Sequence, residues 1–332
     1  MKGKVEVSAG GESMDTGKPG QDGRERPSLL QARAARPGPE GVVVRKKESS
    51  DSKEAGKAGG SERGGCPRGR GIDRPPDPSA PLSPWAGSGV FAYPVEVFPG
   101  VLISGALCAF IKSERALVLA DLHMGFEAVA AADGACFPKR QKPLIVKRLE
   151  RALAIFRPEL VVIAGDFKHN FGRSSAQEWR EVEEVLNFLD SRADVALVRG
   201  NHDNYLQSII SPRPLPLQME VGGVLVLHGH QEVPALERWC GPKILAHEHP
   251  SLRLRDRVGA QVGAPAFLVD RASTTLVLPA LSPLAPGADV ARGPITSPVL
   301  RSMDVGRMEA FAADRGELLG FGPLSSLREL EC

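Results

Sequence analysis

Cysteine pairs, long apolar runs and an excess of one charge are all missing from this sequence, and each shortage excludes a class of protein. The five cysteines are scattered over 332 residues without a CxxC pair, so neither a disulfide framework nor a thiolate zinc site is indicated. No stretch approaches the roughly 18 consecutive apolar residues of a membrane span. Residues 1–15 also lack the apolar core of a signal peptide. We therefore expect a cytoplasmic protein with reduced thiols and no membrane segment.

The charges nearly cancel. Lysine and arginine number 42 against 40 aspartates and glutamates, a formal net charge of +2, which by itself predicts neither nucleic-acid binding nor acidic partners. Hydrophobic residues make up 42% of the chain, as in globular proteins. The length allows one large domain or two modest ones.

Composition changes near residue 90. Residues 1–90 hold 17 of the 36 glycines and 10 of the 28 prolines, with Trp85 as the single aromatic residue. Such a segment buries too little apolar surface to offset the loss of chain entropy. We predict a disordered, basic, Gly/Pro-rich extension over 1–90, a folded domain over 91–325 and a short tail over 326–332. The glycine-rich basic run 63–74 is compatible with nucleic-acid contact, with a solvated tail, and with an upstream start that is not used.

From residue 91 onward, apolar periodicity predicts regular elements. Strands are expected at 93–98, 101–104, 107–111, 116–120, 160–164 and 194–199, and helices at 141–156 and 175–190. Ser175 and Glu178 form a capping box at the start of the second helix. Trp179, Val182, Leu186 and Leu189 are expected to form its apolar face. The β-α-β-α-β run predicts parallel strands with right-handed crossovers. Later strands are expected at 221–227, 243–246, 264–270 and 274–278.

Five apolar runs share one unusual feature, because each ends abruptly in Asp, Asn or His. They are ALVLADLH (116–123), VVIAGDFKHN (161–170), ALVRGNHD (196–203), VLVLHGH (224–230) and KILAHEH (243–249). A buried strand that delivers a polar residue at its carboxyl end is the usual place for a site in an α/β sheet. The runs therefore predict one shared site.

The donors in these runs are oxygens and imidazoles, without sulfur. This set suits manganese, iron, zinc or cobalt and is poorly matched to calcium. We single out seven of these donors: Asp121, His123, Asp166, Asn201, His228, His247 and His249. Seven exceed the needs of one tetrahedral zinc, but they suffice for two metal ions about 3.5–4 Å apart that share a carboxylate. In an extended segment, residues i and i+2 point the same way, so each D-x-H or H-x-H pair is expected to reach one cluster.

The blocks DLHMG, GDFKHN, GNHD, the isolated His228 and AHEH, in this order, resemble the signature blocks of the calcineurin-like metallophosphoesterases. The resemblance spans residues 116–250 and is closest to the SbcD-type repair nucleases and the small archaeal phosphoesterases related to them. It implies an α/β sandwich of two mixed β-sheets flanked by helices. One departure is Ala246, where the family usually has glycine; an alanine is tolerable if this position needs no positive φ.

The resemblance also implies two divalent metal ions, with manganese expected and iron, zinc or cobalt as alternatives. The implied ligands of the first ion are Asp121, His123, Asp166 and His249. Those of the second are Asp166 (as the bridge), Asn201, His228 and His247. His202 is similar to the family's histidine that contacts the phosphate and protonates the leaving oxygen, and Asp203 would orient neighbouring groups. His169 resembles the partner histidine of the SbcD-type branch.

The implied reaction is in-line attack on phosphorus by a metal-bridging hydroxide, with His202 as general acid. Arg253, Arg255 and Arg257 alternate along a predicted strand and would share one face. This face either holds a phosphate backbone or is simply solvated. His230 has no assigned role and is expected to be structural or to lie behind the ligands. The separate capping domain of the full repair nucleases is not expected here.

Three functions remain open from the sequence. The first is hydrolysis of a phosphodiester in nucleic acid, which the SbcD likeness and His169 favour. The second is the same chemistry on a small nucleotide, as a phosphodiesterase or phosphatase. The third is a non-catalytic scaffold that uses this fold to bind a protein partner, although none of the implied ligands is missing from the sequence.

Overall fold

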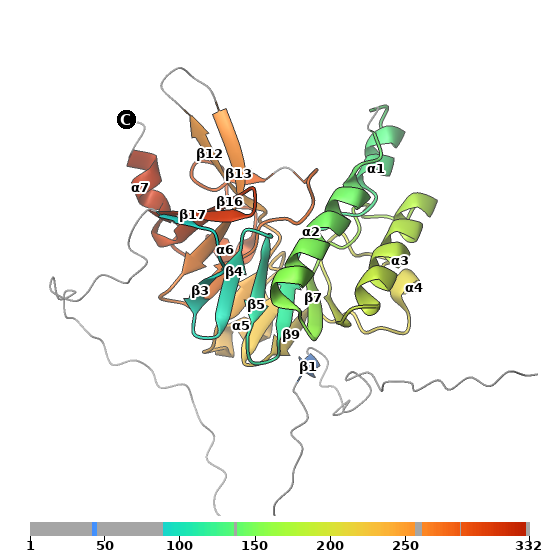
Figure 1. The fold of residues 1–332 in the computed structure, drawn as a ribbon, viewed down its shortest axis with the longest axis horizontal. Helices are drawn as coiled ribbons and strands as arrows, with labels where there is room; N and C mark the ends of the chain where they lie inside the picture. The colour runs from blue at the N-terminus through green and yellow to red at the C-terminus, as the bar shows by residue number, and fades with distance from the viewer. Residues whose placement is uncertain (1–41, 45–88, 136–137, 256–260, 286, 330–332) are drawn as a thin grey trace, which may run out of the picture. The chain divides into compact units, whose positions relative to one another are not determined.

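Two β-sheets and the helices that flank them make up the computed structural model of this chain (Figure 1). The structure describes residues 42–44, 89–135, 138–255, 261–285 and 287–329. Most of the predicted N-terminal extension, Arg257, the Arg255 side chain and residues 330–332 of the predicted tail lie outside the part that is described. The domain boundaries at residues 91 and 325 stay predictions.

The smaller sheet contains six strands and carries the predicted β-α-β-α-β run. Its order is β3 (Val95–Phe98), β4 (Val101–Ser104), β5 (Cys108–Ile111), β6 (Ala116–Leu119), β7 (Leu160–Ala164) and β8 (Asp194–Val198). The strands β3 to β6 form an antiparallel meander, whereas β6, β7 and β8 are parallel. The crossover helices are α2 (Gln141–Phe156) and α3 (Ala176–Asp190). The carboxyl ends of the three parallel strands therefore meet at one edge of the sheet.

The helix α3 begins as predicted. The Ser175 hydroxyl accepts a hydrogen bond from the Glu178 backbone N–H, and the Glu178 carboxylate accepts one from the Ser175 N–H, which completes the capping box. Val182, Val185, Leu186 and Leu189 are buried beneath the helix. The prediction for Trp179 was wrong, since its side chain is 38% exposed. The buried face of α3 is narrower than predicted at this position, and Val185 belongs to it instead of Trp179.

The larger sheet contains eleven strands of mixed direction. Along its main path the order is β1 (Val42–Val44), β9 (Gln218–Val221), β10 (Val224–Leu227), β11 (Lys243–Leu245), β14 (Thr275–Val277), β13 (Gln261–Asp270), β16 (Glu309–Asp314), β17 (Glu317–Pro323) and β2 (Gly89–Phe91). Two further strands, β12 (Pro250–Arg255) and β15 (Ala288–Asp289), branch from β13. The single strand predicted at 221–227 is instead the hairpin of β9 and β10. Gly222 and Gly223 adopt φ angles of 55° and 80° at the turn, which glycine allows without strain.

Alternation along the strands divides the apolar core between the two faces of the larger sheet. Val224 and Val226 of β10 join the cluster that also contains the smaller sheet, α2 and α3, whereas Leu225 and Leu227 belong to a second cluster. The helices on that second side are α5 (Pro234–Arg238), α6 (Pro298–Arg301) and α7 (Leu324–Glu329). The layers thus run helix, sheet, sheet, helix, which confirms the predicted α/β sandwich of two mixed sheets flanked by helices.

The remaining elements are short: α1 (Phe126–Ala132), α4 (Gln207–Ile210) and a 3₁₀ turn at Val305–Arg307. None of the helices in the described part of the chain has the length and apolarity that a membrane span requires. Cys108 is a free, buried thiol.

Candidate metal centre

Five strand ends, three from the smaller sheet and two from the larger one, carry the polar residues that the sequence singles out. Asp121 and His123 follow β6, Asp166 and His169 follow β7, and Asn201 and His202 follow β8; His228 follows β10, and His247 and His249 follow β11. The strands β10 and β11 are parallel neighbours. The structure brings these residues together between the ends of the two sheets.

Backbone hydrogen bonds fix the loops after β6 and β7 side by side. The Asp121 N–H donates to Gly165 O over 3.1 Å, and the His123 N–H donates to Asp166 O over 3.0 Å. On the other side of the β6 loop, the Leu281 N–H donates to Ala120 O over 2.9 Å. The strand ladder therefore continues into the loops, which holds their side chains at a defined separation.

The backbone adopts the left-handed region at five of the predicted ligands. The φ angles of Asp121, His123, Asp166, His247 and His249 lie between 47° and 70°. A non-glycine residue in this region costs about 1–2 kcal/mol, and such strain gathers at functional sites. The pair Asp121 and His123 and the pair His247 and His249 do reach the shared centre, but through left-handed turns and not through the extended backbone that we expected. The pair His228 and His230 does not, because only His228 has a donor atom in the centre.

The first group of donor atoms, called group 1 below, lies around Asp121. The Asp121 Oδ1 atom is 3.3 Å from His249 Nε2, and His249 Nε2 is 3.2 Å from His123 Nε2. All four members have a donor atom within 4.8 Å of the others; they are Asp121, His123, Asp166 and His249. Asp121 Oδ1 is buried, yet it makes no hydrogen bond to any part of the chain that the structure describes. An unsatisfied carboxylate oxygen facing two imidazole nitrogens fits a divalent cation.

The second group, called group 2, lies on the other side of Asp166 and consists of Asp166, His228 and His247. His228 Nε2 is 3.2 Å from Asp166 Oδ2 and 3.1 Å from Asn201 Oδ1. The other ring nitrogen of His228 is 3.0 Å from the Ala164 carbonyl, so Nδ1 donates there and Nε2 is left to face the centre. Groups 1 and 2 with Asn201 contain the two ligand sets that the sequence implied, and Asp166 belongs to both.

Two glycines leave the space that this arrangement needs. A Cβ atom on Gly165 would lie 2.4 Å from His228 Nδ1, and one on Gly200 would lie 2.1 Å from Asp166 Oδ1. Neither distance is compatible with a side chain. Ala246, where the family usually has glycine, is wholly buried and is not among the residues with positive φ. The alanine is therefore accommodated.

One comparison with known proteins, the match to a family model, agrees with this geometry. The family model for calcineurin-like phosphoesterases matches residues 114–274, which contain both donor groups. These residues therefore form a calcineurin-like phosphoesterase domain. The protein is a hydrolase that acts on phosphoric ester bonds. A crystal structure of the nuclease MPE from Pseudomonas putida is similar to this phosphoesterase, with 22% identity, a TM-score of 0.46, and coverage of 69% of this chain and 98% of that chain. The search of curated proteins gave no significant match.

Burial and local charge set the protonation of the phosphoesterase centre. Burial lowers the pKa of His123 to about 3 and that of His247 to about 4, so both imidazoles are neutral at pH 7 and have a lone pair for a metal. Burial acts in the same direction on His228, but the carboxylates of Asp166 and Asp121 outweigh it and raise its pKa to about 9. The protein's own groups therefore favour a positive charge between Asp166 and His228.

His202 and His169 lie at the edge of group 1. The His202 Nδ1 atom is hydrogen-bonded to the His169 carbonyl, so the ring presents Nε2 to the centre, 3.9 Å from Asp166 Oδ2. The His202 backbone N–H donates to Asp166 Oδ1 over 2.9 Å. His169 Nδ1 is 3.3 Å from His123 Nδ1, and burial lowers the pKa of His169 to about 4. Both histidines thus lie beside group 1, and their catalytic roles stay predictions.

Asp203 supports the loop as expected. Its carboxylate accepts hydrogen bonds from the Gly200 N–H (2.8 Å) and the Phe167 N–H (2.9 Å), which links the loops after β8 and β7. Burial, followed by the charge of Asp166, raises the pKa of Asp203 to about 6. His230 stands behind His228, with ring centroids 5.3 Å apart, and its buried Nδ1 lacks a hydrogen-bond partner in the described structure.

Three supporting residues had no assigned role in the sequence. Gln141 donates to the His123 carbonyl over 2.7 Å, Glu178 accepts from the His169 N–H over 2.9 Å, and Glu248 accepts from the Ser297 N–H over 2.7 Å. Only the capping-box pattern marked Glu178 as special. Gln141 stands at the start of a helix and Glu248 lies between two histidines, but their partners are far away in the sequence, so no local pattern could identify them.

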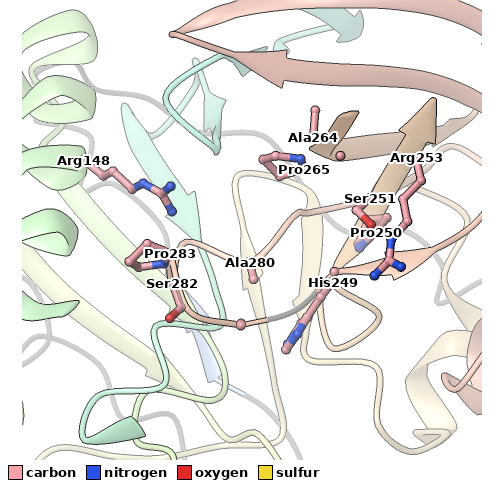
Figure 2. Close-up of a pocket in the computed structure, with 13 residues that line it drawn as sticks. Arg148, His249, Pro250, Ser251, Arg253, Ala264, Pro265, Ala280, Ser282 and Pro283 are labelled. Atoms are coloured by element: carbon pink, nitrogen blue, oxygen red, sulfur yellow. The ribbon is translucent and has the colours of Figure 1, made fainter. Parts of the chain in front are cut away.

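Arg253, predicted to contact substrate, lies close to the centre. With His249 it lines a pocket of about 240 Å³ (Figure 2). The predicted substrate contact of Arg255 concerns a side chain outside the described residues.

Proposed function

We propose that this protein is a two-metal phosphodiesterase that hydrolyses phosphodiester bonds in nucleic acid. Group 1 would hold one divalent cation and group 2 with Asn201 would hold the other, with manganese as the expected metal. The observation that carries the proposal is the shared position of Asp166, whose Oδ2 lies 3.2 Å from His228 Nε2 and 3.9 Å from His123 Nε2. A carboxylate between two imidazole-rich groups is the donor arrangement of two-metal hydrolases.

Two such cations supply the Lewis acidity that stabilises charge on a phosphoryl group and lowers the pKa of a bound water. The side chains around them do the rest. His202 Nδ1 is engaged by the His169 carbonyl, so Nε2 is the atom that delivers a proton to the leaving oxygen. Asp203 and Glu178 hold the two loops on which these histidines stand.

An exposed aromatic residue supports a substrate with nucleobases. Phe171 follows the His169 block, its side chain is 54% exposed, and its ring centroid is 3.7 Å from that of His202. A large apolar ring at the edge of a charged centre offers a stacking surface for a base. It lies on the side of the general acid, where the leaving group departs. The match of His169 to the SbcD-type branch supports the same substrate.

The test is metal-supplemented hydrolysis by the full-length protein and by its His202→Ala variant. The substrates are single-stranded DNA, RNA, bis-p-nitrophenyl phosphate and p-nitrophenyl phosphate, each with manganese and with a chelator. We expect metal-dependent cleavage of oligonucleotides and of the small diester. The His202→Ala change should lower kcat about 10²–10⁴-fold on substrates with a poor leaving group. The same change should lower kcat less for the nitrophenyl substrates, because nitrophenolate leaves without needing a proton.

Activity on p-nitrophenyl phosphate but on neither diester would contradict the phosphodiesterase assignment. Cleavage of small diesters and cyclic nucleotides without any oligonucleotide cleavage would replace nucleic acid with a small nucleotide. If the protein binds two metal ions and hydrolyses none of these substrates, the result would favour a non-catalytic scaffold over a phosphodiesterase.

A further inference from the structure

A pocket opens directly beside the metal centre, and His249 forms part of its wall. The pocket has a volume of about 240 Å³, roughly eight times the ~30 Å³ that one water molecule occupies in the liquid. Figure 2 shows the Arg148 and Arg253 side chains on opposite sides of it, with Ala280 between them. No carboxylate is among the described residues that line it. The pocket is therefore continuous with group 1 and positively charged.

Arg253 is held at the wall without a carboxylate partner. It lies on β12, exposed, and no ion pair links its guanidinium to another described residue. Its cross-strand neighbour on β13 is Gly263. A Cβ atom on Gly263 would approach no atom closer than the Arg253 Cγ at 3.9 Å. The residue opposite Arg253 thus has no side chain to cover or neutralise it.

Arg148 faces the pocket from the other side, on α2. One of its N–H groups donates to the Leu281 carbonyl, and Leu281 is tied to the β6 loop through Ala120. Burial lowers the pKa of Arg148, but an arginine keeps its charge at any physiological pH. Among the described residues no carboxylate pairs with it. A half-buried cation without a counter-charge favours an anion nearby.

We propose that this pocket binds the phosphate next to the scissile one in a nucleic-acid strand. The inference rests on the proposed function, because it requires a phosphodiester at the metal centre, and it adds that the substrate continues past His249. Arg253 and Arg148 contact the flanking phosphate through its oxygens, a contact that fixes the register of the strand and carries no base specificity. A substrate with a single phosphate cannot use the pocket.

Binding without catalysis tests the pocket directly. A fluorescein-labelled single-stranded oligonucleotide is titrated with full-length protein in EDTA at several salt concentrations. The variants are Arg253→Ala and Gly263→Glu, which places a carboxylate opposite Arg253 in the strand pair. The matched control is Arg192→Ala, which removes a positive charge beyond the far end of α3, just before β8 begins. Loss of one phosphate contact reduces the slope of log K against log salt by about 0.7.

We expect Arg253→Ala and Gly263→Glu each to reduce the slope of log K against log salt by about 0.7. The control, Arg192→Ala, should leave the slope unchanged. Because Arg148 also bonds the Leu281 carbonyl, Arg148→Gln is used only if its melting temperature equals that of the wild type. An unchanged slope for Arg253→Ala and Gly263→Glu would overturn the inference, and so would an equal loss in Arg192→Ala.

Hydrolysis separates this inference from the proposed function. The substrates are a dinucleotide with one phosphate, a trinucleotide with two, and bis-p-nitrophenyl phosphate. We expect the wild type to have a lower KM for the trinucleotide than for the dinucleotide, and Arg253→Ala to remove that difference. If all proteins cleave the small diester and Arg253→Ala keeps the trinucleotide preference, the proposed phosphate pocket is wrong, whereas the phosphodiesterase function is still supported. If nothing is cleaved but the salt slope falls, the function is wrong and the pocket still binds phosphate.

Discussion

The Asp166 carboxylate and the His228 imidazole, which come from different sheets, meet in the buried interior with 3.2 Å between Oδ2 and Nε2. The contact joins the carboxyl end of β7 to that of β10. It is compatible only with a glycine at position 165, since a Cβ atom there would lie 2.4 Å from His228 Nδ1. The geometry of the centre thus depends on residues that carry no chemistry themselves.

The first prediction concerns that glycine. Gly165→Ala adds a methyl group against His228 at a φ of 92°, so it combines overpacking with backbone strain. We expect a loss of about 3 kcal/mol in the free energy of unfolding, measured by urea denaturation. Gly100→Ala is the control, because its φ is 78° but no atom lies within 4 Å of the added Cβ. It should cost only the strain, about 1 kcal/mol. Equal losses in the two variants would show that the contact with His228 is unimportant.

The second prediction is a pH dependence of metal binding. Before metal binds, the raised pKa of His228, about 9, keeps a proton on its ring at neutral pH. A cation in group 2 must displace that proton, so its apparent affinity should rise about tenfold per pH unit between pH 6 and 8. The measurement is a competition titration with a chelating dye at fixed ionic strength. An affinity that stays constant over this range would show that His228 is neutral before metal binds.

The proton on His228 also makes the stability of the metal-free fold depend on pH. This stability falls as the pH rises, whereas the metal affinity increases. Because the pKa of His228 is raised above its ordinary value of 6.5, the pair with Asp166 stabilises the metal-free fold fully below pH 6.5. That contribution is lost as the pH rises through about 9. We therefore expect a saturating metal concentration to raise the melting temperature more at pH 8 than at pH 6. A larger rise at pH 6 would contradict the linkage.

The third prediction concerns Glu248, which lies between His247 and His249. Its carboxylate accepts hydrogen bonds from the backbone N–H groups of Thr296 and Ser297 and from the Thr296 hydroxyl. Glu248→Gln weakens all of them and loosens the loop that carries both histidines. We expect a 10–100-fold loss of metal affinity, as for other residues that orient ligands, measured by calorimetry. Glu183→Gln, at an exposed position of α3, makes the same charge change and should have no effect.

Local patterns in the sequence predicted the elements whose cause is local. The capping box at Ser175 and the parallel strands β6, β7 and β8 follow from apolar periodicity and spacing, and both are present. The hairpin at Gly222 and Gly223 was missed because the apolar alternation continues through both strands. The roles of Gln141 and Glu248 depend on partners 18 and 49 residues away, and no spacing rule within one segment contains that information.

For the candidate site, the sequence predicted which residues meet but not how the backbone brings them together. The five left-handed φ angles cannot be read from residue types, since Asp and His adopt them only when the surrounding structure enforces it. The pocket beside His249 depends on Arg148 and Arg253, which are distant in sequence and line opposite sides of it. From the sequence we predicted substrate contacts for Arg253 and Arg255, but not for Arg148.

The most direct test of the account is the number of metal ions that the protein holds when one ligand at a time is changed. Purified wild type, His249→Ala, His247→Ala and Asp166→Asn are dialysed against the same free manganese concentration and measured by elemental analysis. We predict two ions per chain for the wild type, one for each single-histidine variant and none for Asp166→Asn, because only Asp166 belongs to both groups. Retention of one ion by Asp166→Asn, with affinity equal to that of the histidine variants, would contradict a shared carboxylate and with it the proposed two-metal centre.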